Sequence, residues 1–137
     1  MDFNFAEINW LAVVASVVAG QIISTVWFVA LFGEPWAQEY GAESKAQHTK
    51  EVPMYTYGVQ LSCTVVLVIS LALLHRAVGV ASVVDALQVG VFVALGFCIA
   101  TGVPGQAFLK RWRVAAIAYG SQTAMILGIS VILGAWR

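Results

Sequence analysis

Three glutamine side chains are the first candidates for chemistry in this chain of 137 residues. Gln21, Gln60 and Gln122 each fall well inside a long apolar stretch. An amide left unpaired in hydrocarbon is costly, so these side chains must face protein or water. They indicate either hydrogen bonds between helices or the polar lining of a path for a small solute or ion. We favour hydrogen bonds, because neutral amides give no charge selectivity.

Two titratable side chains lie near the ends of apolar stretches. Asp85 could relay a proton or a cation, but Ser82 three residues earlier predicts a capping box at a helix start. His75 could ligate haem or a chlorophyll-type pigment. A single histidine beside Arg76, without a Cys-x-x-Cys-His motif, instead indicates a polar residue at the level of the lipid headgroups.

The remaining reactive side chains form no recognisable site in the sequence. Cys63 and Cys98 are expected at different depths, which disfavours a disulfide, and no metal-ligand spacing occurs. No histidine, cysteine or pair of acids shares a depth with a plausible base or nucleophile. We therefore expect a protein without enzymatic activity and without a metal or cofactor.

Four apolar stretches, residues 8–32, 54–74, 83–101 and 114–136, position these side chains. Each approaches the ~20 residues that a helix needs to cross a ~30 Å hydrocarbon core. Charged residues make up 10% of the chain, against about a quarter in soluble domains. Residues 1–137 are thus expected to form one all-α domain, an integral membrane bundle of four transmembrane helices. The net charge of zero gives no case for nucleic acid as a partner.

The connections between these stretches carry further signals. Pro35 and Gly41 predict a short helix after the first span, with Trp36 and Tyr40 on one face, lying along the membrane interface. Residues 43–51 are expected to be an exposed linker with a solvated His48. Residues 103–105, Val-Pro-Gly, are expected to end the third helix.

Basic residues predict the orientation. The loops 33–52 and 103–113 carry five of them, and the opposite side carries two, Arg76 and Arg137. The positive-inside rule therefore places both loops in the cytoplasm and both termini outside, in a multi-pass protein. Interfacial tryptophans fit this frame, with Trp10 and Trp136 as outer anchors and Trp36 and Trp112 as inner anchors.

Small residues recur every four positions on three of the spans, which predicts close helix packing. The rows are Ala12, Ser16, Gly20 and Ser24; Gly90, Ala94, Cys98 and Gly102; and Ala116, Gly120, Ala124 and Gly128. A partial row, Gly58, Ser62 and Ser70, lies on the second span. Four helices cannot easily fill every such groove within one chain, so we expect a homo-oligomer or a larger membrane complex.

The motif around the end of the first span supports a family resemblance. Asn9-Trp10, Trp27-Phe28 and the segment 31–36, Leu-Phe-Gly-Glu-Pro-Trp, resemble the bacterial membrane family called domain-of-unknown-function family 1761. Val29-Ala30 stands where that family usually has Ser-Pro. The resemblance implies a small multi-pass protein of the bacterial inner membrane, with no established activity to assign to particular residues.

Two functions follow as hypotheses. The first is a non-enzymatic membrane protein that self-associates or joins a larger complex through its small-residue faces. The alternative is a channel or transporter for a small solute or ion, with the three glutamines lining its path.

Overall fold

The computed structural model describes residues 4–136, which form helices and turns without a strand. The first span is α1 (Trp10–Thr25), continued by a π-helical turn η2 (Val26–Leu31). The second is α4 (Tyr55–Ala77), and the fourth is α7 (Trp112–Ala135). The third joins α5 (Val83–Val93), the π-helical turn η3 (Ala94–Ile99) and α6 (Ala100–Phe108). At 22, 23, 26 and 24 residues, all four are long and apolar enough to cross a membrane, which confirms the predicted fold class.

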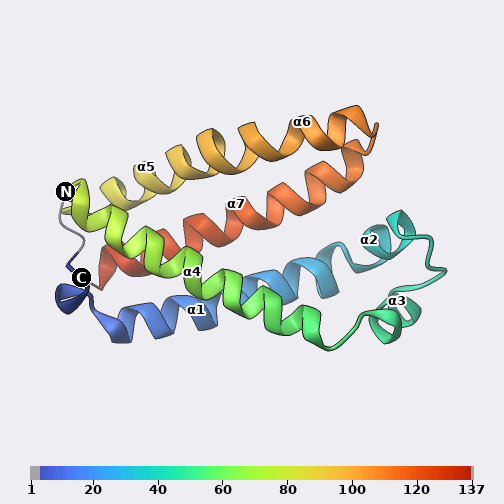
Figure 1. Ribbon diagram of the computed structural model, residues 1–137, viewed down its shortest axis with the longest axis horizontal. Helices are drawn as coiled ribbons and strands as arrows, with labels where there is room; N and C mark the ends of the chain where they lie inside the picture. Colours follow the sequence, from blue (N-terminus) through green and yellow to red (C-terminus); the bar gives the residue numbers. More distant parts are fainter. Residues whose placement is uncertain (1–3, 137) are drawn as a thin grey trace.

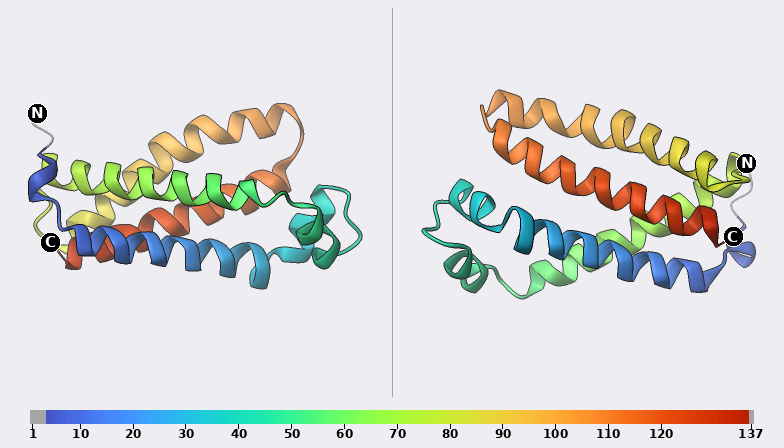
Figure 2. Two further views of the ribbon diagram at one scale, coloured as in Figure 1. Left: turned by 60° about the horizontal axis from the view of Figure 1, so that its bottom comes forward. Right: turned by 180° about the vertical axis from the view of Figure 1, so that it is seen from behind.

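Helix α7 is the centre of the bundle. It packs against α1 on one side and against α5 on the other, as both views of Figure 2 show. Helix α4 crosses α1, and the α5–α6 span runs antiparallel to α7 (Figure 1). Asn9 and Trp136 meet at one end of the bundle, through a hydrogen bond of 3.4 Å from the Asn9 amide to the Trp136 carbonyl. Helices α2 and α3 lie at the opposite end (Figure 1).

The helices approach closely where glycine or serine lies between them. A Cβ atom at Gly20 of α1 would lie 3.0 Å from the Cγ2 atom of Thr64 on α4. A Cβ atom at Gly90 of α5 would lie only 2.6 Å from the Oγ atom of Ser130 on α7. Because lipid tails give helices little reason to associate, such close van der Waals contact is a main source of bundle stability.

The third span ends later than predicted, so residues 103–105 do not break it. Pro104 lies inside α6, which continues to Phe108. The π-helical turn η3 precedes it, and local π-type adjustments help a membrane helix to accommodate proline. The helix ends instead in a Schellman turn, in which the Arg111 N–H bonds the Gln106 carbonyl at 2.9 Å. Lys110 occupies the left-handed position of this turn with φ 56°.

The connection between the first two spans holds two short helices. One is α2 (Gly33–Glu39), the predicted short helix, and Gly41 follows it with φ 76°. The other is α3 (Lys45–Glu51), so the predicted exposed linker is mostly exposed but contains a short helix that was not predicted. Ser44 caps α3 by accepting a 3.2 Å hydrogen bond from the Gln47 N–H. His48 is half-buried and stacks on Tyr40, with ring centroids 5.4 Å apart, rather than standing free in solvent.

Candidate functional site

The three glutamines bond to three different neighbours and not to one another. Gln21 donates to the Thr64 hydroxyl at 2.8 Å, and Gln60 donates to the Ser24 hydroxyl at 3.4 Å. Gln122 accepts a hydrogen bond from the Cys98 thiol. The first two bonds join α1 to α4, and the third joins the α5–α6 span to α7. The side chains therefore tie pairs of helices, and Gln60 and Gln122 remain exposed on the outside of the chain.

The predicted rows of small residues lie partly inside and partly outside the bundle. The α1 row is buried along its whole length: Ala12, Ser16, Gly20 and Ser24. On the third span, Gly90 and Ala94 are buried while Cys98 and Gly102 are half-buried. On α7, Gly120, Ala124 and Gly128 are half-buried and Ala116 is exposed. The partial row on α4, Gly58, Ser62 and Ser70, is exposed throughout.

The predicted tryptophan anchors divide between the two ends of the bundle. Trp10 and Trp136 lie at the end where α1 begins and α7 ends, and both are exposed. Trp112 is exposed at the opposite end, at the start of α7. Trp36, in α2, lies between the rings of Phe28 and Tyr40, with centroids 4.8 and 5.0 Å away.

Trp27 matches the family motif, but its contact with α7 was not predicted from the sequence. Its indole N–H donates to the Ile117 carbonyl of α7 at 2.9 Å. Its ring covers Gly120, where a Cβ atom would lie 2.7 Å from the ring. The sequence signal for this contact was a tryptophan near the end of the first span and a glycine in the last span. This contact attaches the π-helical end of the first span to α7.

Basic side chains bind the turns together at the α2 end. Arg111 donates to the Glu39 carbonyl at 3.2 Å, and Arg113 lies 3.7 Å from the Glu39 carboxylate. Lys45 reaches back to the Val29 carbonyl in η2 at 3.0 Å. These contacts hold α2 and α3 against the ends of the spans. Three of the five basic residues expected in the cytoplasmic loops therefore also make structural contacts.

The predicted capping box at the start of α5 is confirmed. The Ser82 hydroxyl accepts from the Asp85 N–H at 3.1 Å, and the Asp85 carboxylate accepts from the Ala81 N–H at 3.1 Å. Ser82 is thus the N-cap residue, and Asp85 satisfies a further amide before the first turn.

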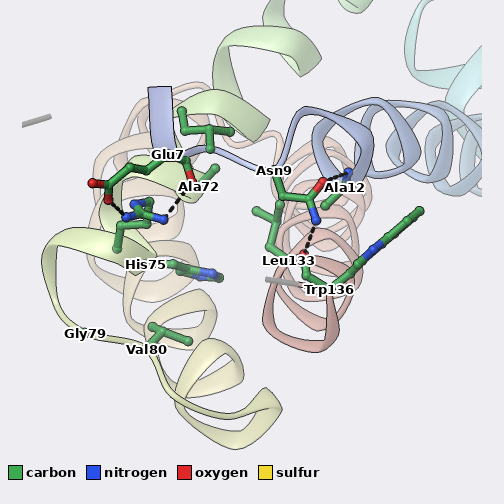
Figure 3. A pocket seen from close by; sticks show the side chains of 11 residues that line it. Glu7, Asn9, Ala12, Ala72, His75, Gly79, Val80, Leu133 and Trp136 are labelled. Carbon is green, nitrogen blue, oxygen red and sulfur yellow. Dashed lines mark hydrogen bonds and ion pairs between the residues drawn. The ribbon is translucent and has the colours of Figure 1, made fainter. Parts of the chain in front are cut away.

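An open cavity of about 290 Å³ lies at the end of the bundle where Asn9 and Trp136 meet. This terminal cavity is lined by Glu7, Asn9, His75, Val80, Leu133 and Trp136, among others. Figure 3 shows the lining side chains, which come from the start of α1, the end of α4 and the end of α7.

His75 is the polar side chain buried most deeply in this cavity wall. Only 5% of the residue is exposed, so the ring packs within the bundle rather than pointing outward. The physical reason is the end of α4, where Gly79 takes φ 72° in a Schellman turn. The Val80 N–H then bonds the His75 carbonyl at 2.9 Å, which folds Val80 back beside the ring. Neither ring nitrogen has a hydrogen-bond partner within residues 4–136.

The side chains of Arg76, Glu7 and Asn9 in the terminal cavity are already paired. Arg76 forms an ion pair with the Glu7 carboxylate and also donates to the Glu7 carbonyl at 2.7 Å. Asn9 caps α1 by accepting from the Ala12 N–H at 3.1 Å, and its amide group bonds Trp136 (Figure 3). An unpaired buried polar group costs about 1–3 kcal/mol, so His75 is the exception in this wall.

Metal and redox candidates are few in the described part of the chain. Within residues 4–136, no group of three or more histidine, cysteine, aspartate or glutamate side chains is arranged to hold a metal ion. Cys63 and Cys98 are both free, with Cys63 exposed on α4.

The fold and these contacts define a multi-pass α-helical membrane protein whose polar side chains mostly join its helices. Residues 11–134 match the family model described as protein of unknown function (DUF1761), and the chain belongs to this family. No curated protein and no solved structure matches the chain. The resemblance noted from the first span is therefore confirmed over nearly the whole sequence.

Proposed function

We propose that this chain is a non-enzymatic subunit of a membrane assembly, and that it self-associates through the first half of α4. One observation carries the proposal. Tyr55 and residues 57–63 are all exposed, so most of this half of α4 is left uncovered by the rest of the chain. In Figure 1 it diverges from α5, α6 and α7 toward the end that holds α2 and α3.

The uncovered segment has the composition of a contact surface rather than of a lipid-facing one. Gly58, Gln60, Ser62 and Cys63 lie on it, and a Cβ atom added at Gly58 would meet no other atom within 4 Å. Gln60 lies six residues, or ~9 Å, from the midpoint of α4, still within the ~15 Å half-thickness of the hydrocarbon. An amide and small residues at that depth favour contact with another helix.

A second copy of the chain suits this surface best. Gly58 and Ser62, four residues apart, lie on one face of α4, and a two-fold axis beside them brings the small residues of both copies together. The absence of large side chains at these two positions allows the two helices to cross closely there. Gln60 lies about 200° around the helix from Gly58, and its bond of 3.4 Å to Ser24 turns it toward α1, so it takes no part in this pairing.

The rival hypothesis of a glutamine-lined path has less support from the geometry. The three amides bond separate partners, and none of them lines the terminal cavity or the open apolar groove between α6 and α7. Solute flux in liposomes that falls with both Gln21→Leu and Gln122→Leu would favour this rival.

We also propose the bacterial inner membrane as the location, with both termini outside. The support is the excess of basic residues at the α2 end, where Lys45, Lys50, Lys110, Arg111 and Arg113 lie. Because residues 103–108 belong to α6, the second cytoplasmic loop shortens to residues 109–111.

Mass measurement in lipid nanodiscs or mild detergent tests self-association. We expect a dimer for the wild type and a monomer for Gly58→Leu, because the larger side chain separates the crossing helices. Gly96→Leu is the matched control, since Gly96 is also exposed with nothing within 4 Å. A monomeric wild type, or equal effects of the two substitutions, would contradict the proposal.

A further inference from the structure

We propose that the terminal cavity is a binding site for a small uncharged amphiphile, a mainly apolar molecule whose hydroxyl group pairs with His75. The inference is independent of self-association, because the cavity lies at the opposite end of α4 from Gly58. His75 is 95% buried and faces the open space of the cavity. Neither of its ring nitrogens has a hydrogen-bond partner within residues 4–136.

The chemistry of the imidazole selects the polar part of the ligand. An uncharged imidazole carries one N–H donor and one acceptor nitrogen. A hydroxyl group both donates and accepts, so it can pair with whichever nitrogen faces the cavity. In Figure 3 the His75 ring projects from α4 toward the space that Val80 and Leu133 border, which places that pairing inside the cavity.

The remaining wall selects an uncharged and mainly apolar ligand. Arg76 and Glu7 neutralise each other at the rim, so neither charge is left to hold an ion. Both polar atoms of the Asn9 side chain are engaged, one by Ala12 and one by Trp136. Leu133 and Val80 supply apolar surface opposite these groups.

The size of the cavity bounds the ligand. Its volume of about 290 Å³ is near the lower limit of known ligand pockets. It would hold roughly ten water molecules at ~30 Å³ each, which corresponds to a single substituted ring or a short branched chain. A hydroxyl-bearing ligand of this size could come from solution or from the hydroxyl end of an uncharged lipid.

The two histidines of the chain make a direct test. The protein is labelled with ¹⁵N-histidine, reconstituted in phosphatidylcholine nanodiscs and titrated with 4-ethylphenol. We expect the ring-nitrogen signals of His75 to shift saturably, while those of His48 stay fixed, because His48 stacks on Tyr40 at the far end of the bundle. Ethylbenzene, which lacks the hydroxyl, should shift His75 at least tenfold less at equal concentration.

Two variants and one lipid complete the experiment. Val80→Trp fills the cavity and should weaken the 4-ethylphenol response at least tenfold, whereas Val78→Trp, on an exposed neighbour in the same turn, should leave it unchanged. Diacylglycerol in the nanodisc, if it shifts His75, identifies a lipid ligand; a response to 4-ethylphenol alone identifies a diffusible one. The proposal is overturned if neither compound shifts His75, if both histidines shift together without saturation, or if Val80→Trp responds like wild type.

Discussion

The contact between Gly90 and Ser130 gives the sharpest prediction about what holds the bundle together. A Cβ atom at Gly90 would lie 2.6 Å from the Ser130 Oγ atom and 3.1 Å from its Cβ atom. Both distances are too short for ordinary packing, and Ser130 is fully buried at 0% exposure. Gly90→Ala therefore forces α5 and α7 apart or distorts one of them.

The magnitude follows from two opposing effects. Overpacking a tight contact costs about 1–3 kcal/mol, and replacing glycine by alanine in a helix returns up to about 1 kcal/mol. With the full return, Gly90→Ala should lower the free energy of unfolding by about 0–2 kcal/mol, which places it about 1–3 kcal/mol below Gly96→Ala. Gly96→Ala, which meets nothing within 4 Å on the same span, should leave it unchanged or raise it by up to about 1 kcal/mol.

Ser130→Ala supplies the decisive control. It removes the atom at 2.6 Å and leaves only the milder contact at 3.1 Å. The Ser130 hydroxyl has no hydrogen-bond partner within residues 4–136, so its loss alone should cost little. The free energy of unfolding of the double variant, Gly90→Ala with Ser130→Ala, should be about 1 kcal/mol higher than the sum of the two single changes predicts. Unfolding in mixed micelles with increasing dodecyl sulfate, followed by circular dichroism, measures all four variants. Equal stability of Gly90→Ala and Gly96→Ala, or no recovery in the double variant, would refute the proposed contact.

Three further substitutions test local features of the fold. Lys110→Gly should raise the free energy of unfolding by about 1 kcal/mol, because glycine takes φ 56° without strain, and a higher midpoint in the same titration checks this. Ser82→Ala should cost about 1 kcal/mol and speed hydrogen exchange of the Asp85 amide, which Ser82 now caps; unchanged exchange would count against the cap. Trp27→Phe should cost about 0.6 kcal/mol for the lost bond to Ile117, plus packing over Gly120, and an unaltered midpoint would argue against that contact.

The spans were predictable because their signal is local. Length and hydrophobicity alone place the four helices, since a membrane helix must satisfy its backbone internally and present apolar side chains. The N-cap at Ser82 could also be predicted from the sequence, because Ser82 and Asp85 lie within one helical turn of each other. The helix α3 carried a similar signal in Ser44 and Gln47, three residues apart, which its high polarity obscured.

The remaining features depend on contacts between distant segments. The sequence around Pro104 suggests a break, and only the π-helical turn before it shows how the helix continues. The burial of His75 depends on the packing of α1 and α7 around the end of α4, which no local pattern reveals. The terminal cavity itself was therefore not predictable, because its walls come from residues 7 to 136, nearly the full length of the chain.

Disulfide cross-linking in native membranes tests the central proposal, self-association through α4, most directly. Cys63 is exposed on the uncovered half of α4, whereas Cys98 is half-buried and bonded to Gln122. Mild oxidation should yield a covalent dimer in the wild type and in Cys98→Ser, but none in Cys63→Ser. Val14→Cys on the Cys63→Ser background controls for random collisions, since Val14 is 58% exposed on α1. Rapid linkage is expected through Cys63 and little through position 14, because only Cys63 lies on the proposed interface. Equal yields at both positions, or no dimer through Cys63, would rule out self-association through α4.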